Sequence, residues 1–504
     1  MIIGYIKRGT EHVRSEGNPG RRKAYEHCSL CHIRRKLRSQ EEGRMPLRER
    51  QERALNDPTV GHIIDGKYVP IVKKDASSLA PTLLDWADAQ LCENLFSDMI
   101  AEIGEVYSHD DAMKLYAIAV LRVCNPDVKD CELQEKYQDF FLSEFHPGIP
   151  LSRNTVSKFL SDIGKQLPMI YEFMRKRAEK VGIDHHLLIN GTLKSNDSTI
   201  NTLSDYSYKS RLRNRNDISV LYAFDLEKGE PVCSLCYPGD MLDATAYSDF
   251  IDGCGISGGI IVADKGFPVS AIEDRLKENG NLHYLSPLKR SSLMIRDHAT
   301  LSFEDVLADG RGNIKYKKHP LSDGRFLYSF RDPVRAMKEE SDYLRSRRKN
   351  RDYDSGNYEK KSRSFGTIVF VSDTDLTPSQ AWQCYSSRWE IGLVMRFYKH
   401  ALEFDDTREH SDYSVYGSEF VDFLSETLTY RLLNRFKEKG LLETQMYSKV
   451  MKTLKRAKKV KIGDEWKLVR INPVEEEGLR KLGLLPGEEP QPKRKRGRPR
   501  KQAQ

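Results

Sequence analysis

Short apolar runs separated by turn signals fill residues 185–288, and their order limits the possible folds more than any other feature of the chain. The first run, His186 to Asn190, is typical of a buried strand, and it ends at Gly191. Two further runs, Ile218 to Phe224 and Pro231 to Tyr237, flank a Glu-Lys-Gly-Glu segment, which indicates a β-hairpin. We therefore expect three strands in succession.

The pattern then alternates between helix and strand. Asp243 to Ile251 has a helical pattern, Gly259 to Ala263 is a strand that stops at Asp264, Val269 to Leu276 is helical, and His283 to Leu285 is a strand. This βββαβαβ order, continued by a later helix, predicts an α/β fold of the ribonuclease-H-like type. Such a fold has a hairpin-extended mixed sheet with helices on its faces.

Composition indicates a soluble intracellular protein. Only 38% of the 504 residues are hydrophobic. No apolar run approaches the roughly 18 residues of a membrane span, and the apolar start, Met1 to Ile6, is too short for a signal peptide. Nine cysteines, an odd number, argue against a disulfide framework. We expect a cytoplasmic protein without a membrane partner.

Cys28 and Cys31, followed by His32, have the spacing of half a zinc site. A zinc site needs a second pair of ligands nearby, and the sequence shows none. Two interpretations stay open: a metal site, or a basic arm that contains two thiols.

Positive charge indicates a polyanionic partner. The net charge is +8, and basic residues cluster near both chain ends and at Arg345 to Arg351. The tail contains the core of an AT-hook, Arg496-Gly497-Arg498-Pro499. Glycine keeps such a strand slim enough for a narrow minor groove, and the arginines follow the negative potential of A·T tracts. The alternatives are a nuclear-type basic signal and a solvated tail.

The segment from Leu151 to Gly164 has the pattern of the second helix of a helix-turn-helix. Ser152 is placed to cap it, and four apolar side chains are spaced to pack inward. The polar side chains left free for a DNA groove are Arg153, Asn154, Ser157 and Lys158. The alternative is an ordinary amphipathic helix.

The segment from Tyr385 to Lys399 gathers polar groups on one helical face. At about 100° per residue, Tyr385, Arg388, Gly392 and Lys399 share that face. We expect this helix to complete a site in which acidic and basic groups meet.

Six regions are expected along the chain. They are a basic N-terminal arm (1–75), a helical, helix-turn-helix-like DNA-binding region (76–182), the first part of the ribonuclease-H-like core (183–288), an inserted β-rich subdomain (289–375), the core helix with C-terminal helices (376–460), and a linker with the AT-hook tail (461–504).

Several segments, in this order, resemble the DDE transposases of insertion sequences, in the group with a Tyr-Arg-Glu-Lys signature. The segments are GTLKSNDSTIN, DISVLYAFDLEKGEPVCSLCYPGDMLDATAYSDFI, GIIVADKGFP, LHYLSPLKR, YSSRWEIGLVMRFYK and SVYGSEFVDFLS. The resemblance implies a ribonuclease-H-like catalytic domain, Mg²⁺ or Mn²⁺, and movement of a DNA element by strand cleavage and transfer.

The family's site residues carry over only in part. Tyr385, Arg388 and Lys399 match the signature residues that act on DNA, and Lys265 beside Asp264 is a further candidate DNA contact. Asp264 matches the second acid and is the expected metal ligand. Two acidic positions differ: Asn190 replaces the first Asp, and Gly392 replaces the Glu.

Neighbouring acids are candidate substitutes. Asp197 lies seven residues past Asn190, about 23 Å along an extended strand, so its chain would have to fold back. Glu390 lies two residues before Gly392, which turns it about 160° around the helix. Asparagine can still offer a neutral oxygen to a metal, whereas glycine offers none.

We expect a transposase-type protein that binds the terminal inverted repeats of an element and target DNA, as a homodimer in a synaptic complex in the nucleoid. Three interpretations stay open. The first is an active enzyme, the second is a catalytically inactive relative that acts as a DNA-binding protein or repressor, and the third is a general nuclease with the same fold.

Overall fold

The computed structural model describes residues 82–196, 198–207, 215–241, 243–262, 280–309, 312–387, 407 and 409–486, with the backbone of four strands between Ile3 and Pro70. The chain divides into two compact units, Met1–Thr82 and Leu83–Gln504. Each unit is described by itself.

The first unit contains an antiparallel sheet in the order β2-β1-β3-β4. Its strands are β1 (Ile3–Lys7), β2 (Thr10–Arg14), β3 (Thr59–Ile64) and β4 (Lys67–Pro70). From the sequence this region was expected only to be a basic arm, and its strands were not predicted. Cys28 and Cys31 lie outside the described residues.

The second unit begins with one short strand and a group of helices. These are β5 (Leu83–Asp85), α3 (Ala87–Phe96), α4 (Asp98–Gly104), α5 (His109–Cys124), η3 (Asp130–Glu132), α6 (Leu133–Gln138), α7 (Leu142–Phe145), α8 (Arg153–Lys165) and α9 (Leu167–Glu179). Within the region expected to be helical (76–182), Leu83–Asp85 forms a strand instead, because β5 pairs with β15 (Lys458–Ile462) near the other end of the unit. Tertiary pairing overrides local preference there.

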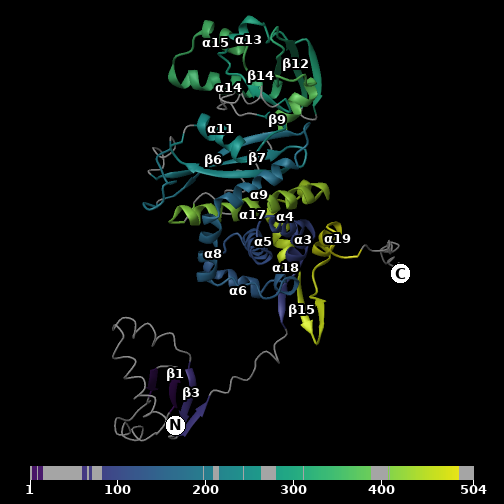
Figure 1. Ribbon diagram of the computed structural model, residues 1–504. Coiled ribbons are helices and arrows are strands. Elements are labelled where there is room, and N and C mark those ends of the chain that lie inside the picture. The colour runs from purple at the N-terminus through teal and green to yellow at the C-terminus, as the bar shows by residue number, and fades with distance from the viewer. Residues whose placement is uncertain are drawn as a thin grey trace, which may run out of the picture. The chain divides into compact units, whose positions relative to one another are not determined.

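A nine-stranded mixed sheet forms the centre of the second unit (Figure 1), in the order β11-β12-β13-β14-β10-β9-β6-β7-β8. The strands are β6 (His186–Ser195), β7 (Asp217–Asp225), β8 (Glu230–Pro238), β9 (Gly259–Val262), β10 (Leu282–Pro287), β11 (Asp305–Asp309), β12 (Gly312–Pro320), β13 (Phe326–Arg331) and β14 (Thr367–Ser372). β6, β7 and β8 are antiparallel, whereas β6, β9 and β10 are parallel. The predicted mixed α/β sheet is confirmed.

The strands of the predicted insertion extend this same sheet. β14 pairs antiparallel with β10, with Leu285 opposite Ser372, and β13, β12 and β11 follow outward. Three helices belong to this part of the chain: α13 (Leu293–Asp297), α14 (Pro333–Asn350) and α15 (Ser355–Ser362). A further helix occupies residues 378–387. The core sheet and the insertion therefore share one hydrogen-bonded framework, and α11 (Asp243–Gly253) connects β8 to β9.

Helix α17 (Asp412–Glu438) lies between the sheet and the N-terminal helices. It packs against β8 on one side and against α3, α5 and α8 on the other (Figure 1). Eighteen of its 27 residues are buried, which makes it the central helix of this unit.

Glycines allow α17 and α8 to approach closely. A Cβ at Gly417 would stand 1.9 Å from the carbonyl oxygen of Leu160, and a Cβ at Gly164 would stand 1.7 Å from that of Tyr413. Real Cβ atoms do not come so close to backbone atoms, so both positions require glycine.

The chain beyond α17 returns to the start of the unit. It forms η4 (Leu441–Glu443), α18 (Tyr447–Arg456), β15 (Lys458–Ile462), β16 (Glu465–Leu468) and α19 (Pro473–Lys481). β15 pairs with β5 and β16 in a three-stranded antiparallel sheet. The sequence predicted helices up to residue 460 and a linker after it, and the hairpin of β15 and β16 was not expected.

Asp88 is a buried carboxyl group in α3, only 2% exposed. Burial and then the nearby charge of Asp85 raise its pKa to about 7. The backbone N–H of Ala89 donates to its Oδ1 at 3.0 Å. This bond, the charge of Lys455 and the backbone N–H of Asp88 lower the pKa but do not offset the burial.

We expect Gly417→Ala to lower the free energy of unfolding by about 2 kcal/mol or more, because its methyl group overlaps the backbone of α8. Gly478→Ala is the matched control, since a Cβ there meets no atom within 4 Å. That change should be neutral or add up to about 1 kcal/mol in a helix. Urea unfolding measures both, and equal effects would contradict the close helix contact.

We expect Asp88→Asn to stabilise the chain at pH 8 and to have little effect at pH 4. The unfolded chain releases this proton near pH 4, whereas the folded chain keeps it to about pH 7. The carboxyl group therefore costs stability increasingly between those values and fully above them, by up to about 4 kcal/mol. Urea unfolding at both pH values, with exposed Asp127→Asn as control, tests this; a gain independent of pH would contradict it.

Candidate functional site

Asn190 lies inside β6 and not at its end. β6 runs through the predicted break at Gly191, because the antiparallel pairing with β7 continues and sets Asn190 opposite Tyr222 and Gly191 opposite Leu221. Asn190 is half-buried and Gly191 is exposed, whereas all other residues of β6 are buried. β6 is therefore accessible to solvent only at Asn190 and Gly191, and Asn190 is the position expected for the first acid.

The parallel pairing of β6 with β9 ends close to this opening. Leu188 lies opposite Val262, the last described residue of β9. Asn190 is two residues beyond Leu188, and Asp264 is two residues beyond Val262 in the sequence.

Most of the predicted site lies outside the described residues. This holds for Asp197, Asp264, Lys265, Arg388, Glu390, Gly392, Lys399, Arg496, Gly497, Arg498 and Pro499. Their predicted roles, and the convergence of Asp264 with Arg388 and Lys399, stay predictions.

Tyr385 lies in the helix at 378–387 and is half-buried. Its hydroxyl group hydrogen-bonds to the guanidinium of Arg335 in α14, and its ring packs against Phe370 of β14 at 5.6 Å between centroids. Arg335 and Arg290 both bind Glu339, at 2.8 Å each. Burial raises the pKa of Glu339, but the Gly366 N–H and the two arginines lower it below its usual value. Tyr385 therefore joins this helix to the insertion.

Helix α8 matches the predicted second helix of a helix-turn-helix in its extent and its faces. Val156, Phe159, Leu160 and Ile163 are buried, and Arg153, Asn154, Ser157 and Lys158 are exposed. Ser152 is the N-cap residue, but its hydroxyl group bonds the Thr155 hydroxyl at 2.7 Å and not the helix backbone. The exposed face is available to a partner, and DNA contact there stays a prediction.

A buried ion cluster joins β6 to α17 and α5. Lys194 Nζ lies 2.5 Å from Glu419 and 2.9 Å from Asp422, and each of these side chains is no more than 7% exposed. Arg122 of α5 binds Asp422 at 2.9 Å and Asp130 at 3.1 Å. Burial alone would lower the pKa of Lys194, but Asp422 and Glu419 raise it above its usual value, so the ammonium stays charged.

Sequence reasoning missed this cluster, although its members lie in noted motifs. Lys194 closes the Gly-Thr-Leu-Lys segment, and Glu419 and Asp422 lie in the SVYGSEFVDFLS segment. The available signal was the three-residue spacing of two acids within an apolar helix, which places both on one face.

Among the described residues, one group of His, Asp and Glu lies close enough to hold a metal: His185, Asp225 and Glu227. His185 binds Asp225 at 2.7 Å, and His186 binds Glu227 at 2.7 Å. Asp225 also accepts the backbone N–H groups of Glu227 and Lys228. Each carboxylate already has hydrogen-bond partners, and these bonds hold the turn between β7 and β8 to the start of β6. The group lies at the start of β6, about 15 Å along the strand from Asn190.

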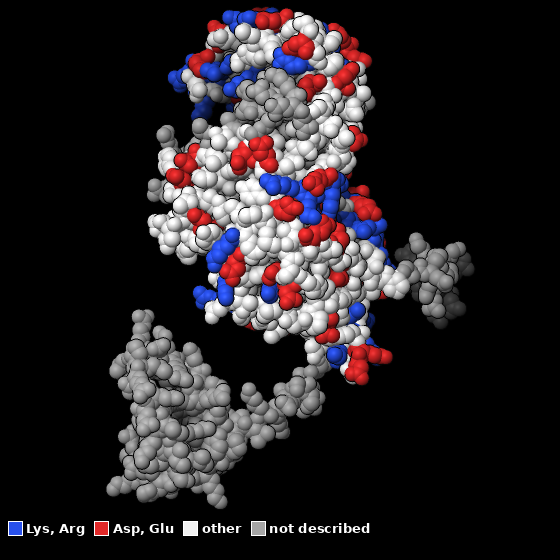
Figure 2. All heavy atoms as spheres, viewed as in Figure 1, with Lys and Arg blue, Asp and Glu red and all other residues white. Residues whose placement is uncertain are grey.

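A groove of about 600 Å³ lies beside this hairpin. The tip of the hairpin, the C-terminal turns of α17 and Ser387 line it. The helix at 378–387 lies near the hairpin, since its Ser387 lines the same groove. Burial and then the charge of Glu227 raise the pKa of the Cys384 thiol in this helix to about 12. Figure 2 shows both Lys or Arg and Asp or Glu gathered over this end of α17.

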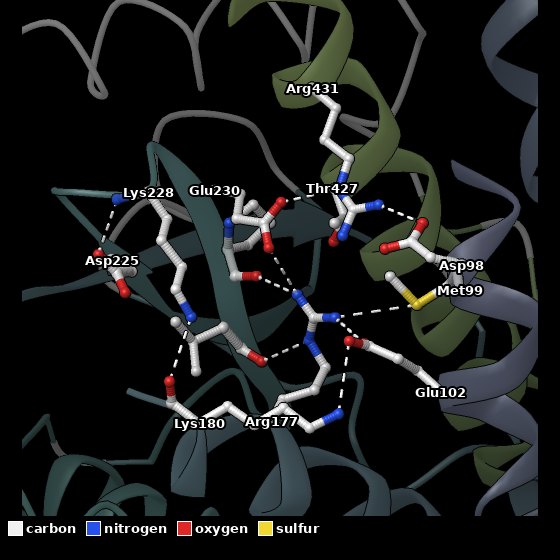
Figure 3. A network of polar contacts seen from close by, with 12 residues as sticks. Asp98, Met99, Glu102, Arg177, Lys180, Asp225, Lys228, Glu230, Thr427 and Arg431 are labelled. Carbon is white, nitrogen blue, oxygen red and sulfur yellow. Dashed lines mark hydrogen bonds and ion pairs between the residues drawn. The ribbon is translucent and has the colours of Figure 1, made fainter. Parts of the chain in front are cut away.

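Figure 3 shows how the N-terminal helices are joined to the sheet. Arg177 of α9 binds Glu102 of α4 at 2.5 Å and donates to the carbonyl oxygens of Pro231 and Val232 in β8. Arg431 of α17 binds the same strand through Glu230 at 2.8 Å. Two arginines therefore fix β8 between the predicted DNA-binding region and α17.

Within the described part of the chain, no helix combines the length and apolar character that crossing a membrane requires.

Residues 192–415 match the family model described as the transposase DDE domain. The match begins two residues after Asn190 and includes β7 to β10, the insertion and the signature segment. It supports a transposase of the DDE type for this part of the chain. No match was found among curated proteins.

Among solved structures, the chain is similar to a piggyBac transposase in a cryo-EM structure of its synaptic complex with hairpin DNA. The identity is 12% and the TM-score 0.38, over 73% of this chain and 79% of that chain. A likeness this weak carries no argument.

We expect Lys194→Met to lower the free energy of unfolding by about 3–5 kcal/mol, because Glu419 loses its cation while buried. Exposed Lys452→Met should change stability by less than about 0.5 kcal/mol. The double change Lys194→Met with Glu419→Gln should lose less than Lys194→Met alone. Urea unfolding tests this; a loss at Lys194 no greater than at Lys452 would show that the cluster is not stabilising.

Proposed function

We propose that this protein is a DDE-type transposase that binds the ends of a mobile DNA element and catalyses metal-dependent strand cleavage and transfer. The observation that carries the proposal is the match of residues 192–415 to the transposase DDE domain. The expected partners are the element's terminal inverted repeats and target DNA, bound by a homodimer. The Tyr-Arg-Glu-Lys group of insertion-sequence enzymes is the proposed subgroup.

The strand arrangement supports the ribonuclease-H-like form of this proposal. An antiparallel trio, β6 to β8, is followed by β9 and β10 in parallel with β6, which is the order expected from the sequence. If the register of Leu188 with Val262 continues, Asp264 comes beside Asn190 on the neighbouring strand. Residues of equal register on parallel strands present their side chains on the same face. We therefore propose that Asn190 and Asp264 share one site.

The proposed cofactor is Mg²⁺ or Mn²⁺, and its ligand set departs from the family's. When two such ions are bound between three acids, one activates the attacking oxygen and the other stabilises the leaving one. Here Asn190 is neutral and Gly392 offers no ligand. The group formed by His185, Asp225 and Glu227 does not replace them, because its carboxylates hold the hairpin. Two of the three positions that are anionic in the family therefore do not fit the metals.

This misfit favours a second candidate function. A chain with the same fold and only one of the acids can still bind element ends or A·T-rich DNA through α8 and the AT-hook, and act as a repressor. Binding of this kind needs the exposed Arg153 and Lys158 but no metal.

A cleavage assay separates the two functions. We expect the full chain to bind labelled duplexes taken from the DNA that flanks its coding region, and to nick them in Mn²⁺. The double change Asn190→Asp with Gly392→Glu restores both acids and should raise the nicking rate more than about tenfold, since even outer-shell changes at metal sites cost that much. Asp264→Ala on either background should abolish nicking.

The outcomes are distinct. Nicking by the unaltered chain that Asp264→Ala abolishes supports the enzyme. Binding without nicking, followed by nicking in the double variant, supports the inactive relative. If neither chain binds the flanking duplexes better than an unrelated duplex, both proposals fail.

A further inference from the structure

The C-terminal part of α14, the turn after it and α15 form a positively charged helical hairpin, which we call the basic hairpin (residues 345–363). It contains eight Lys or Arg and three Asp or Glu, a net charge of +5 over 19 residues. Neither the matched family's acids nor the predicted helix-turn-helix accounts for this density of charge.

The hairpin is rigidly built. Arg351 ends α14 in the left-handed conformation, at φ 57°, and turns the chain back. Asp354 then caps α15 by accepting the backbone N–H of Asn357 at 2.6 Å. Tyr343 of α14 packs against Tyr358 of α15 at 6.2 Å between ring centroids. The cations therefore stand on a fixed support and not on a loose loop.

Four of the cations are exposed and uncommitted. Arg347 binds Asp352 and lies 5.3 Å over the Tyr343 ring, so it belongs to the support. Arg345 pairs with Asp342 and Arg363 with Glu359. Lys361 lies 5.4 Å from the centroid of the Tyr343 ring. Within the described part of the chain, no carboxylate forms an ion pair with the remaining four, which are Arg348, Lys349, Arg351 and Lys360. Figure 2 shows Lys and Arg gathered on this end of the molecule, over α14 and α15.

A helix C-terminus by itself attracts cations, because its carbonyl groups carry partial negative charge. That effect accounts for basic residues in the last turn of each helix. It is worth about 0.3–1 kcal/mol per residue at the surface and needs one or two of them. It does not require Arg351, which lies beyond α14, or an excess of eight cations over three acids. The surplus charge indicates an anionic partner.

We infer that the basic hairpin binds the phosphate backbone of duplex DNA, without reading its sequence. The stretch of α14 from Tyr343 to Asn350 spans about 10 Å at 1.5 Å per residue. Duplex DNA presents about three phosphates per strand over that length. Four free cations on a rigid face of this size fit such a row, and long Arg and Lys side chains reach phosphates without entering a groove.

This inference extends the proposed function but does not need strand cleavage. In a transposase the hairpin would hold duplex at the far edge of the sheet, beyond β14, away from Asn190. A chain that cuts no DNA would still bind through the hairpin, so the two proposals fail separately.

The test is the salt dependence of binding to a plain duplex of mixed sequence. The variant Arg348→Gln, Lys349→Gln, Lys360→Gln removes three of the cations. Each lost phosphate contact lowers the slope of log Kd against log salt by about 0.9, so we expect a slope smaller by about 2 to 3. Equal binding of an RNA duplex with the same loss would mean that the face is not specific to DNA and would overturn the proposal.

The matched control removes three exposed cations elsewhere: Lys315→Gln, Lys449→Gln and Lys452→Gln. Its slope should stay within about one unit of the unaltered chain. Thermal unfolding of both variants shows whether each is folded. An equal loss in both would mean that only net charge matters, and no loss in the hairpin variant would overturn the proposal.

Lysine acetylation provides an independent measurement on the unaltered chain. Bound duplex should protect Lys349 and Lys360 from acetylation several-fold, as read by mass spectrometry, and leave Lys449 and Lys452 unprotected. Equal labelling of Lys349 with and without duplex would contradict contact at the hairpin.

Discussion

The buried charge of Lys194 is the constraint on which the position of β6 depends. A buried lysine stays charged only when nearby carboxylates offset its loss of hydration, and Glu419 and Asp422 of α17 supply them. Asp422 in turn binds Arg122 of α5. Thr407 completes the arrangement, because its hydroxyl group donates to Glu419 and its backbone N–H to Ser195. The strand that carries Asn190 is thus held to α17 four residues away.

The candidate functional regions lie at different places along the nine-stranded sheet. β6, which carries Asn190, and β9 lie side by side within the sheet, and the insertion extends the sheet through β14 to β11. Tyr385 joins the helix at 378–387 to the insertion, since its ring packs on β14 and its hydroxyl group meets Arg335 of α14. The proposed DNA contacts at α8 and at the basic hairpin are connected by packed elements, because α8 packs on α17, α17 packs on β8, and the strands of the insertion continue the same sheet.

Much of the fold could be predicted from the sequence because local patterns agree with tertiary packing in the core. The strands β7, β8 and β9 lie where the periodicity predicted them, and so does the helix α8 with its buried Val156 and exposed Arg153. The predicted end of the strand at Gly191 is wrong, because the antiparallel pairing of β6 with β7 continues on both sides of this glycine. β5 and β15 were missed because their pairing joins residues almost 400 positions apart, which no local pattern reports.

The candidate site was less predictable than the fold. The Gly-Thr-Leu-Lys segment marks Asn190 as the residue in place of the first acid, and that role stays a prediction. The Lys194 cluster was not found, since each of its charges alone has the appearance of a surface residue. Long-range ion pairs of this kind follow from the fold and cannot be derived before it.

A disulfide between β6 and the segment after β9 tests the central claim, that Asn190 and Asp264 lie side by side. The changes Asn190→Cys and Asp264→Cys should oxidise to a disulfide in the folded chain, since neighbouring strands bring Cα atoms within reach of that bond. Asn190→Cys paired with Lys265→Cys is the control, because adjacent residues of a strand point to opposite faces. A cross-link in the first pair and none in the control is the predicted result; no cross-link in the first pair would contradict a shared site.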